Sequence, residues 1–335
     1  MTKALISSEL SRQEASEACE IQLSVVICTY NRAPVLEGTL ESYSKLTEAH
    51  DERIELVIVD NNSTDATSRV ALAAQSSIPG LRYFHEARQG LSHARNRGIQ
   101  ECRGSIIAFA DDDVFFDTGW ASAIIDEFNR HPTADALGGR STPVFEGGRP
   151  AWLLDDYLVF YGDTGFGDQL RWLDFPEHPY GLNMAFRREV FEKVGHFDAN
   201  LGRIKASLLS GEESDLFERI YAGGLRTLYS PKPHLFHRIP KERTSFEWIK
   251  SRFYWQGASD AIREFSSDKP SRMQSLQGAL SALNSAIRMI TGRNISPRRI
   301  YWHYSGLKSE GKVYIHYWIG KASQCFKLSI SPPDQ

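Results

Sequence analysis

Three adjacent carboxylates, Asp111, Asp112 and Asp113, directly follow the apolar run at residues 106–110. Carboxylates this close repel one another, so the site is costly to form unless a cation lies among them. Proteins bind Mg²⁺ and Mn²⁺ with one or two carboxylates together with substrate phosphates. The triplet therefore indicates a divalent metal site that takes a phosphate ligand. The alternative is an acidic turn, solvated by water, at the end of a strand.

Polar residues also follow two earlier apolar runs. Thr-Tyr-Asn at 29–31 comes after the run at 23–28, and Asp-Asn-Asn at 60–62 comes after the run at 56–59. In open α/β sheets, ligands bind beyond the carboxyl ends of the strands. We therefore expect these two clusters and the acidic triplet to converge on one crevice.

The elements that position these clusters are predicted from the apolar pattern. Short, continuous runs of β-branched and aliphatic residues are typical of strands buried on both faces. Between the first two runs a helical pattern opens at Pro34, with Leu36, Leu40 and Tyr43 on one face. Alternating strands and helices give βαβ units. The sequence thus predicts an α/β fold with an open, mostly parallel sheet flanked by helices.

The later part of the chain differs in composition. Residues 145–186 are rich in aromatics interleaved with Gly and Asp, which is typical of a functional loop. From about residue 241 the chain becomes basic and has a helical apolar pattern. The aromatic rings of the loop either offer flat faces to an acceptor ligand or close the core. The candidates are Trp152, Tyr157, Trp172 and Tyr180.

The overall composition is that of a globular protein, with 335 residues, 41% hydrophobic, 24% charged, and a formal net charge of −3. It excludes collagen-like, disordered and disulfide-scaffold proteins. The four cysteines form no Cys-x-x-Cys pair, which argues against a zinc site and fits a reducing cytoplasm. We expect neither a membrane-spanning segment nor a signal peptide, because no apolar run is long enough and the first 20 residues are polar.

The small net charge conceals an asymmetry along the chain. Residues 1–225 carry 21 Lys and Arg against 35 Asp and Glu, whereas residues 226–335 carry 18 against 7. A basic segment of this kind suits anionic headgroups, a lipid diphosphate or a partner protein. An anionic membrane surface is therefore the expected partner of the C-terminal part; the alternative is an ordinary solvated surface.

Seven motifs occur in the order and spacing of a known family. Four lie in the first third: SVVICTYNR at 24–32, VIVDNNSTD at 57–65, GLSHARNRG at 90–98 and IAFADDD at 107–113. Three lie further on: NMAFR at 183–187, GHFD at 195–198 and GEESDL at 211–216. From about residue 22 to 260 the chain closely resembles the family-2 glycosyltransferases of the GT-A fold. Each motif alone is a weak signal, whereas the combination is highly specific.

The resemblance implies roles for particular residues. Asp111 and Asp113 match the family's D-x-D motif, which would hold a Mg²⁺ or Mn²⁺ ion, with Asp111 toward the nucleoside and Asp113 on the metal. Asp113 and Asp111 are thus the candidate metal ligands, and His237 is a further one. A lone His is as often a hydrogen-bonded structural residue. The residues that the resemblance assigns to the sugar-nucleotide donor are Thr29, Tyr30, Arg32, Asp60, Arg95, Asn96, Asp111 and Asp112.

The family's catalytic base lies in a Glu-Asp pair that opens a late helix, and Glu212-Glu213 is the matching pair here. Because Glu replaces the second Asp, the base is left open among Glu213, Glu212 and Asp215. A structural interpretation competes with this one. Ser210-x-x-Glu213 is a capping box, and carboxylates in a first helical turn are favoured by the helix dipole.

Together these features predict an inverting, metal-dependent glycosyltransferase in bacterial surface or extracellular polysaccharide synthesis. Its partners would be a nucleoside-diphosphate sugar and a saccharide or lipid-linked saccharide, with no nucleic acid. The expected organisation is a flexible N-terminal tail at 1–20, a GT-A domain at 21–240 and a basic helical extension at 241–335. The expected location is cytoplasmic, peripheral on the inner face of the membrane. The alternative is a non-catalytic sugar-nucleotide-binding or scaffold protein descended from such an enzyme.

Overall fold

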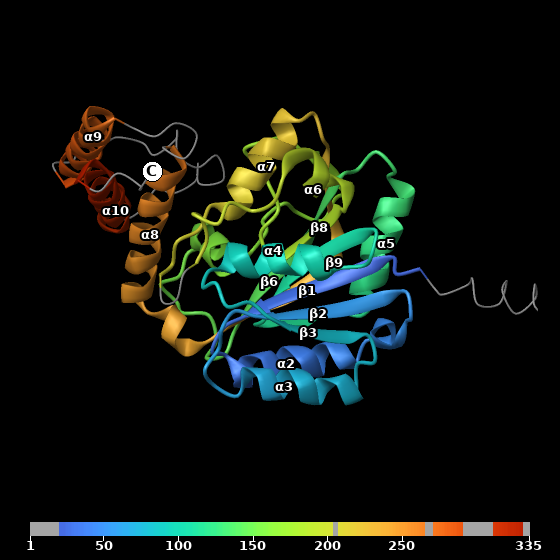
Figure 1. The fold of residues 1–335 in the computed structure, drawn as a ribbon. Helices are drawn as coiled ribbons and strands as arrows, with labels where there is room; N and C mark the ends of the chain where they lie inside the picture. Colours follow the sequence, from blue (N-terminus) through green and yellow to red (C-terminus); the bar gives the residue numbers. More distant parts are fainter. Residues whose placement is uncertain (1–19, 204–206, 265–270, 291–310, 331–335) are drawn as a thin grey trace, which may run out of the picture.

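The computed structural model describes residues 20–203, 207–264, 271–290 and 311–330. Within these residues the central element is a nine-stranded sheet (Figure 1). Its strands run in the order β3-β2-β1-β4-β8-β6-β9-β5, and β7 pairs with β9.

One half of the sheet consists of four parallel strands. They are β1 (Leu23–Thr29), β2 (Ile54–Asp60), β3 (Leu81–His85) and β4 (Ile106–Asp111). Side chains on a strand alternate between the two faces of a sheet. On β1, Val25 and Ile27 therefore belong to one core, while Val26 belongs to the other. Both faces are buried, which is why these strands are continuous apolar runs rather than alternating ones.

The other half of the sheet is mixed. Strand β8 (Asn183–Arg187) is antiparallel to β4 and to β6 (Ala136–Phe145). Strand β9 (Thr227–Ile239) is parallel to β6 and antiparallel to β5 (Val114–Phe116) and β7 (Arg171–Leu173). The predicted α/β fold with flanking helices is thus confirmed, and its parallel pairings lie in β3-β2-β1-β4 and between β6 and β9.

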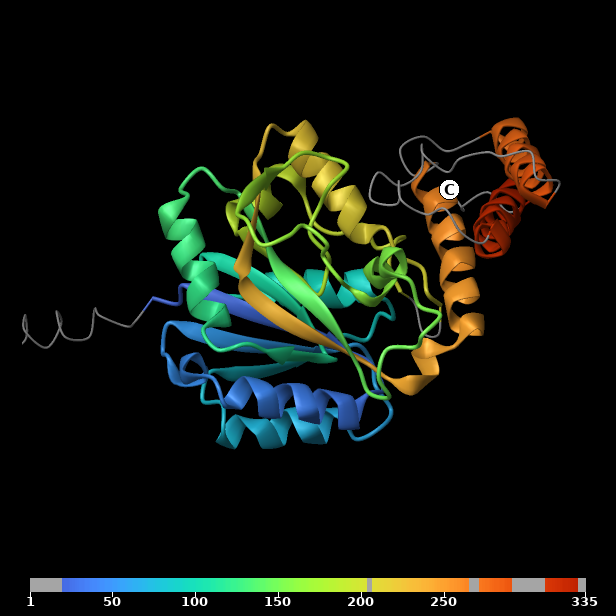
Figure 2. The same ribbon diagram turned by 180° about the vertical axis from the view of Figure 1, so that it is seen from behind.

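Helices cover both faces of the sheet, giving three layers (Figure 2). One face packs against α2 (Ala33–Ser44), α3 (Thr67–Ala73) and α5 (Trp120–Arg130). The opposite face packs against α4 (Leu91–Glu101), α6 (Glu189–Val194) and α7 (Glu212–Ala222). Short 3₁₀ turns complete the domain: η1 (Thr47–His50), η2 (Ala74–Ser76), η3 (Asp155–Tyr161) and η4 (Lys241–Thr244).

The C-terminal part is helical, as predicted. It consists of α8 (Phe246–Glu264), α9 (Arg272–Ile290) and α10 (Gly311–Ile330), with α9 and α10 beyond α8 on one side of the domain (Figure 1). Helices α8 and α10 pack very closely at two glycines. A Cβ atom on Gly257 would lie 2.0 Å from the Tyr317 carbonyl oxygen, and one on Gly320 would lie 1.9 Å from that of Tyr254.

A separate apolar cluster joins this helical part to the rest of the chain. It combines Tyr157 and Tyr161 of η3 with Phe253 of α8 and Tyr317 of α10. The predicted divisions at residues 20 and 240 remain predictions, and residues 1–19 of the tail lie outside the described part. None of the described helices is long and apolar enough to cross a membrane.

Two glycines inside helices provide a test of the packing. A Cβ on Gly98 of α4 would lie 2.5 Å from Cγ1 of Val26 on β1, whereas the nearest atom to a Cβ on Gly38 of α2 is 3.6 Å away. We expect Gly98→Ala to lower the free energy of unfolding by roughly 1–3 kcal/mol, because α4 must move off the sheet. Gly38→Ala, the matched control, should be neutral or stabilising by up to about 1 kcal/mol. Denaturant unfolding measures both, and equal effects would contradict the close packing of α4.

Candidate active site

The carboxyl ends of β1, β2 and β4 meet at one edge of the sheet, as the sequence predicts. The chain turns sharply after the first two strands, where Asn31 and Asn62 adopt positive φ angles of 50° and 65°. The two turns are cross-linked, since the Asn31 amide donates to Ser63 Oγ at 2.8 Å and Asn31 Oδ1 accepts from the Thr64 amide at 2.7 Å. This edge is therefore held rigidly before any ligand binds.

The acidic triplet lies at this edge, surrounded by cations. Asp112 accepts a hydrogen bond from Thr29 Oγ1 at 2.8 Å and an ion pair from Arg32. Arg32 also reaches Asp113 at 2.8 Å, and Arg243 approaches the same carboxylate at 3.3 Å. His237 Nε2 lies 3.3 Å from Asp113 Oδ1, while its Nδ1 lies 2.6 Å from the Tyr161 carbonyl oxygen.

Burial alone would raise the pKa of Asp113, but the charges of His237, Arg32 and Arg243 outweigh it and hold this pKa well below its usual range. Asp112 differs. The effect of burial on the pKa of Asp112 exceeds the opposite effect of Arg32, so this pKa is raised to about 6. Asp113 is therefore the firmly ionised member of the pair.

The same residues can be tested for their fit to a metal ion. Across the described residues, no group of three or more His, Cys, Asp and Glu side chains could hold a metal. An ion shared with a substrate diphosphate needs only one or two protein carboxylates. Oδ1 of Asp113 is buried and accepts no hydrogen bond from the described residues, although it faces His237. Asp111 and His237 line the cavity, whereas Asp113 lies behind them, paired with Arg32 and Arg243. Asp111 and His237, with the unbonded Oδ1 of Asp113, are therefore the groups here that could hold such a shared ion.

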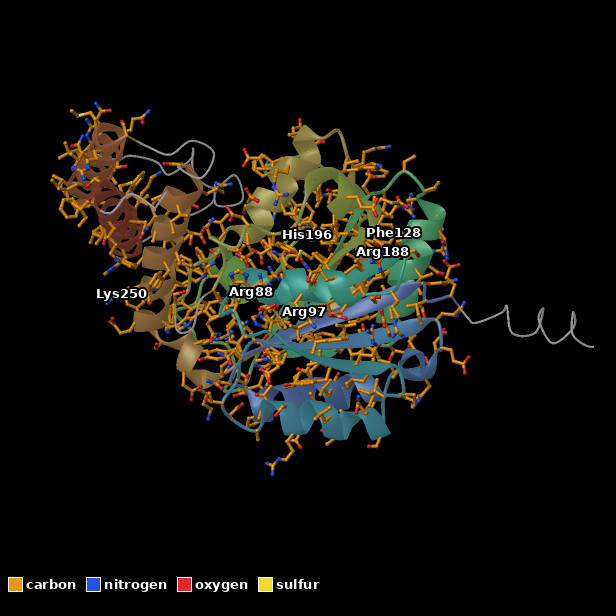
Figure 3. All side chains as sticks on the ribbon, in the orientation of Figure 1. Arg88, Arg97, Phe128, Arg188, His196 and Lys250 are labelled. Atoms are coloured by element: carbon orange, nitrogen blue, oxygen red, sulfur yellow. The ribbon has the colours of Figure 1, made fainter. Side chains whose placement is uncertain are left out.

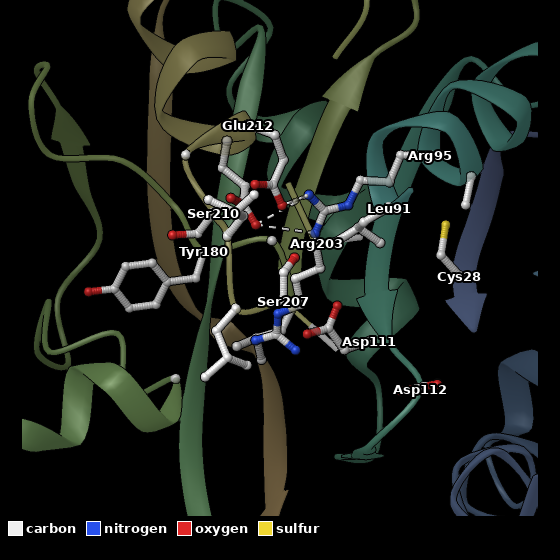
Figure 4. A pocket seen from close by; sticks show the side chains of 18 of the residues that line it. Cys28, Leu91, Arg95, Asp111, Asp112, Tyr180, Arg203, Ser207, Ser210 and Glu212 are labelled. Carbon is white, nitrogen blue, oxygen red and sulfur yellow. Dashed lines mark hydrogen bonds and ion pairs between the residues drawn. The ribbon is translucent and has the colours of Figure 1, made fainter. Parts of the chain in front are cut away.

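Across the pocket from Asp111 and Asp112 lies Glu212 (Figure 4), which forms the first turn of α7 together with Glu213. Arg95 of α4 holds both, at 3.0 Å from Glu212 Oε1 and 3.2 Å from Glu213 Oε1. The Arg95 side chain is 3% exposed, as against 2% for Glu212 and 18% for Glu213. Glu213 is thus the more accessible of the two carboxylates.

The two glutamates differ in protonation. Burial, together with the charge of Glu213, raises the pKa of Glu212 to about 8. Burial acts on Glu213 too, but Arg95 outweighs it and lowers the pKa of that carboxyl. Within the pair, the proton is therefore favoured on Glu212 and the negative charge on Glu213. Only an ionised carboxylate can accept a proton as a general base.

The predicted capping box does not form. Helix α7 is preceded by Gly211, at a φ of +109°, as its N-cap residue, and no side chain caps it. Ser210 instead bonds to α8: its amide donates to Ser259 Oγ at 2.9 Å, and its hydroxyl donates to Gln256 Oε1 at 3.4 Å. The carboxylate of Glu213 is held by Arg95, with a further contribution from its own backbone amide, and Ser210 takes no part in capping the helix.

This connection extends into the C-terminal helices. Gln256 Nε2 donates to Asp260 Oδ1 at 3.2 Å, and the hydroxyl of Tyr317 on α10 donates to Asp260 Oδ2 at 2.8 Å. A chain of side chains therefore runs from α10 through α8 to the residue two positions before Glu212. The helical part braces the segment that carries the glutamate pair.

A cavity of about 470 Å³ lies between the two acidic groups. This volume is in the usual range for small-molecule sites. Several predicted residues line it: Thr29, Tyr30, Arg32, Arg95, Asp111, Asp112, Tyr180, Glu212, Glu213 and His237. Donor-side and glutamate-side candidates thus face one space.

Other predicted residues lie elsewhere. Asp60 is buried and accepts hydrogen bonds from Tyr83 and the Ser63 amide, both at 2.9 Å. Asn96 bonds to the backbone of Phe197, and Asp215 pairs with Arg219 at 2.7 Å. These three side chains hold the local structure together.

The aromatic candidates are also dispersed. Tyr180 lines the cavity, whereas Tyr157 is 3% exposed within the cluster that joins η3 to α8. Trp172 lies on β7 with the Arg226 guanidinium 3.7 Å from its ring centroid, and Trp152 packs edge-on to Phe246. Of the four, the structure brings only Tyr180 to the cavity.

The cavity also has residues that sequence reasoning missed. Arg203, Arg243, Arg252, Gln256 and His178 line it together with the predicted set. They lie outside the seven motifs, and two of them come from α8. The one signal that pointed to Arg243 and Arg252 is the basic composition of the C-terminal part.

Fold and cavity together define a GT-A type glycosyltransferase, and residues 24–195 match the profile of glycosyl transferase family 2. The chain belongs to this family. A glucosyl-dolichyl phosphate glucuronosyltransferase of Haloferax volcanii is 29% identical over 249 residues, covering 73% of this chain and 78% of the relative. The succinoglycan biosynthesis protein ExoM of Rhizobium meliloti is 23% identical over 239 residues, covering 71% and 73%.

Solved structures share the fold. The mannosyltransferase PcManGT of Pyrobaculum calidifontis, in complex with GDP-Man and Mn²⁺, superposes with a TM-score of 0.59 at 18% identity, covering 98% of this chain and 95% of that one. TarS residues 1–349 of S. aureus, in complex with UDP-GlcNAc, gives 0.54 at 13% identity, covering 92% and 90%. At these identities the likeness concerns the fold alone.

The protonated Glu212 makes stability depend on pH. Its pKa is raised from 4.5 to about 8, so the folded chain keeps a proton that the unfolded chain releases. Across that window the free energy of unfolding should therefore fall as pH rises. Glu212→Gln cannot titrate there, so its fall should be smaller. Thermal unfolding between about pH 5 and 8 measures the slopes, with Glu218→Gln, at an exposed position of α7, as control. Equal slopes in all three proteins would mean that Glu212 is ionised when folded.

Proposed function

We propose that this glycosyltransferase moves a sugar from a nucleoside-diphosphate sugar to an acceptor hydroxyl, with metal assistance and inversion at the anomeric carbon. One observation carries the proposal. A single cavity has Asp111, Asp112 and Arg32 on one side and the Arg95-held Glu213 on the other. A donor bound at the first group leaves room for an acceptor at the second.

The strand ends would bind the donor. Thr29, Tyr30 and Arg32 face the cavity beside the acidic triplet and are placed for the nucleoside part. Asp111, Asp113 and His237 would hold a Mg²⁺ or Mn²⁺ ion, which when bound would neutralise the diphosphate as it departs. Arg203 and Arg243 add positive charge to the same cavity and would attract that diphosphate.

Glu213 would act as the base. Its carboxylate takes the proton of the acceptor hydroxyl while the acceptor oxygen forms a bond to the anomeric carbon. The bond between that carbon and the diphosphate oxygen breaks on the opposite face, and its electron pair leaves with the nucleoside diphosphate. Arg95 acts as a positioning residue, because it fixes the Glu213 carboxylate and keeps it ionised.

The relatives support a lipid-linked or polysaccharide acceptor. The Haloferax relative is named for transfer to a glucosyl-dolichyl phosphate, and ExoM for succinoglycan biosynthesis. We propose a role in bacterial surface or extracellular polysaccharide synthesis. Location on the inner face of the cytoplasmic membrane also stays a prediction.

The test is a screen of UDP-, GDP- and dTDP-sugars for hydrolysis or transfer, with Mn²⁺ or Mg²⁺ and with or without a chelator. We expect turnover of at least one donor, abolished by the chelator and restored by metal. Binding without turnover of any donor would favour the alternative, a non-catalytic sugar-nucleotide-binding protein. If the protein showed neither binding nor turnover of any donor, both the enzyme and the binding-protein interpretations would be refuted.

Two substitutions separate donor binding from proton removal. Asp113→Asn should weaken metal-dependent donor binding by roughly 100-fold or more. The reason is that it removes a negative charge that attracts the metal ion. Glu213→Gln should leave donor binding nearly intact and lower kcat by roughly 10²–10⁴-fold, since only the base is lost. Calorimetric titration and steady-state kinetics measure these effects.

The control for both is Glu218→Gln, because Glu218 is exposed on α7 and does not line the cavity. Its binding and kcat should match the wild type. If Glu213→Gln retained its kcat, Glu213 would not be the base.

The stereochemistry of the product tests the single displacement. NMR of the first product formed from an α-linked donor should show a β-linked sugar, because attack opposite the leaving group inverts the anomeric centre. An α-linked product would refute direct attack by a hydroxyl that Glu213 activates.

A further inference from the structure

Helix α9 exposes its large apolar side chains. Met273, Leu276, Leu280 and Leu283 are 65%, 40%, 67% and 49% exposed, and Ile287 is 50% exposed. Their spacing of three and four residues places them on one face of the helix. Single exposed apolar residues are ordinary on a protein surface, but a continuous stripe marks a contact site.

The residues that α9 buries are small. Ser275, Ala282 and Ala286 are 0%, 1% and 3% exposed, and α10 is the described helix with which α9 makes its extensive contact. A helix that packs only on its own domain buries its large apolar residues and exposes its polar ones. Helix α9 does the opposite, so the exposed surface of Met273, Leu276, Leu280 and Leu283 is available to something outside the chain.

The charge around this face indicates which kind of partner would contact it. Helices α9 and α10 contain five Lys and Arg residues and no Asp or Glu, and of the five Lys321 is paired with Glu264 of α8. The whole stretch 271–332 has nine Lys and Arg against Glu310 alone. Two copies of this chain docked through α9 would bring like charges together, and the seam has no oppositely charged flanking residues of the kind that pairs helices. An anionic surface is complementary to it.

The location of the helices agrees with this. Helices α9 and α10 lie farthest from the sheet, and side chains project from them into open space (Figure 3). Helix α8 lies between them and the sheet, and its residues Arg252 and Gln256 line the cavity. A surface in contact with α9 would therefore lie on the α8 side of the active site.

We propose that the exposed apolar face of α9 inserts into the interface of an anionic lipid bilayer, with exposed basic residues such as Arg272 of α9 and Lys327 of α10 contacting the headgroups. An amphipathic helix with apolar and basic residues binds a membrane in this way, parallel to its surface. The role of this membrane contact rests on the proposed function. Docking through α9 would bring a lipid-linked acceptor to the side of the cavity that α8 lines.

The experiment is co-sedimentation of the full chain with vesicles of phosphatidylcholine alone or with about a third phosphatidylglycerol, at low and high salt. We expect binding to the anionic vesicles, weakened by salt and much weaker with neutral lipid. Leu280→Glu should lower the partition coefficient by at least about tenfold, because it places a charge where an apolar side chain was buried in lipid. Met273→Glu, one end of the same face, should act in the same direction.

The matched control is Leu72→Glu on α3, where Leu72 is 48% exposed on a different part of the molecule. It should bind vesicles as the wild type does, and melting temperatures should be the same for all variants. If wild type fails to bind anionic vesicles, or Leu280→Glu binds as well as Leu72→Glu does, the proposal is wrong. A wild-type dimer in solution that Leu280→Glu dissociates would assign the face to a second copy instead.

Vesicle binding is independent of turnover, so this proposal and the proposed function fail separately. Asp113→Asn should bind vesicles normally although it loses donor binding. Leu280→Glu should hydrolyse a soluble donor normally although it loses the vesicles.

Discussion

Asp112, Asp113 and Glu212 are each less than 5% exposed, and a carboxylate this far from water is stable only as an acid or next to an opposite charge. The site uses both solutions. Arg32, Arg243 and His237 surround Asp113, and Arg95 compensates Glu213, whereas Glu212 keeps its proton. Each cation lies where a carboxylate has to stay ionised, so the charge pattern of the pocket is set before any ligand arrives.

The cations come from distant parts of the chain, and this makes the fold and the site inseparable. Arg32 follows β1, Arg95 lies on α4, and Arg243 lies in the turn after β9. The sheet has to be complete for all three to reach their carboxylates. The C-terminal helices participate as well, because α8 holds the segment that leads into Glu212.

The strands β1, β2 and β4 and their acidic ends were predictable, because strands buried on both faces leave continuous apolar runs and ligands gather at their carboxyl ends. The antiparallel direction of β8 was not, since an apolar run carries no sign of direction. The motifs located Glu212 and Glu213, but their difference in protonation depends on burial and on Arg95, which is 117 residues from Glu212. Arg252 and Gln256 belong to no motif, and only packing of α8 brings them to the cavity.

The family match ends at residue 195, yet Glu212, Glu213 and the α8 wall of the cavity come after it. The cavity is thus formed by two parts of the chain: the first contributes the ends of β1 and β4, and the second contributes α7 and α8. Arg95 connects the two parts, because it extends from α4 in the first and forms ion pairs with Glu212 and Glu213 in the second. A chimera of two relatives in which Arg95 no longer met Glu213 would leave the charge of each side chain without its partner.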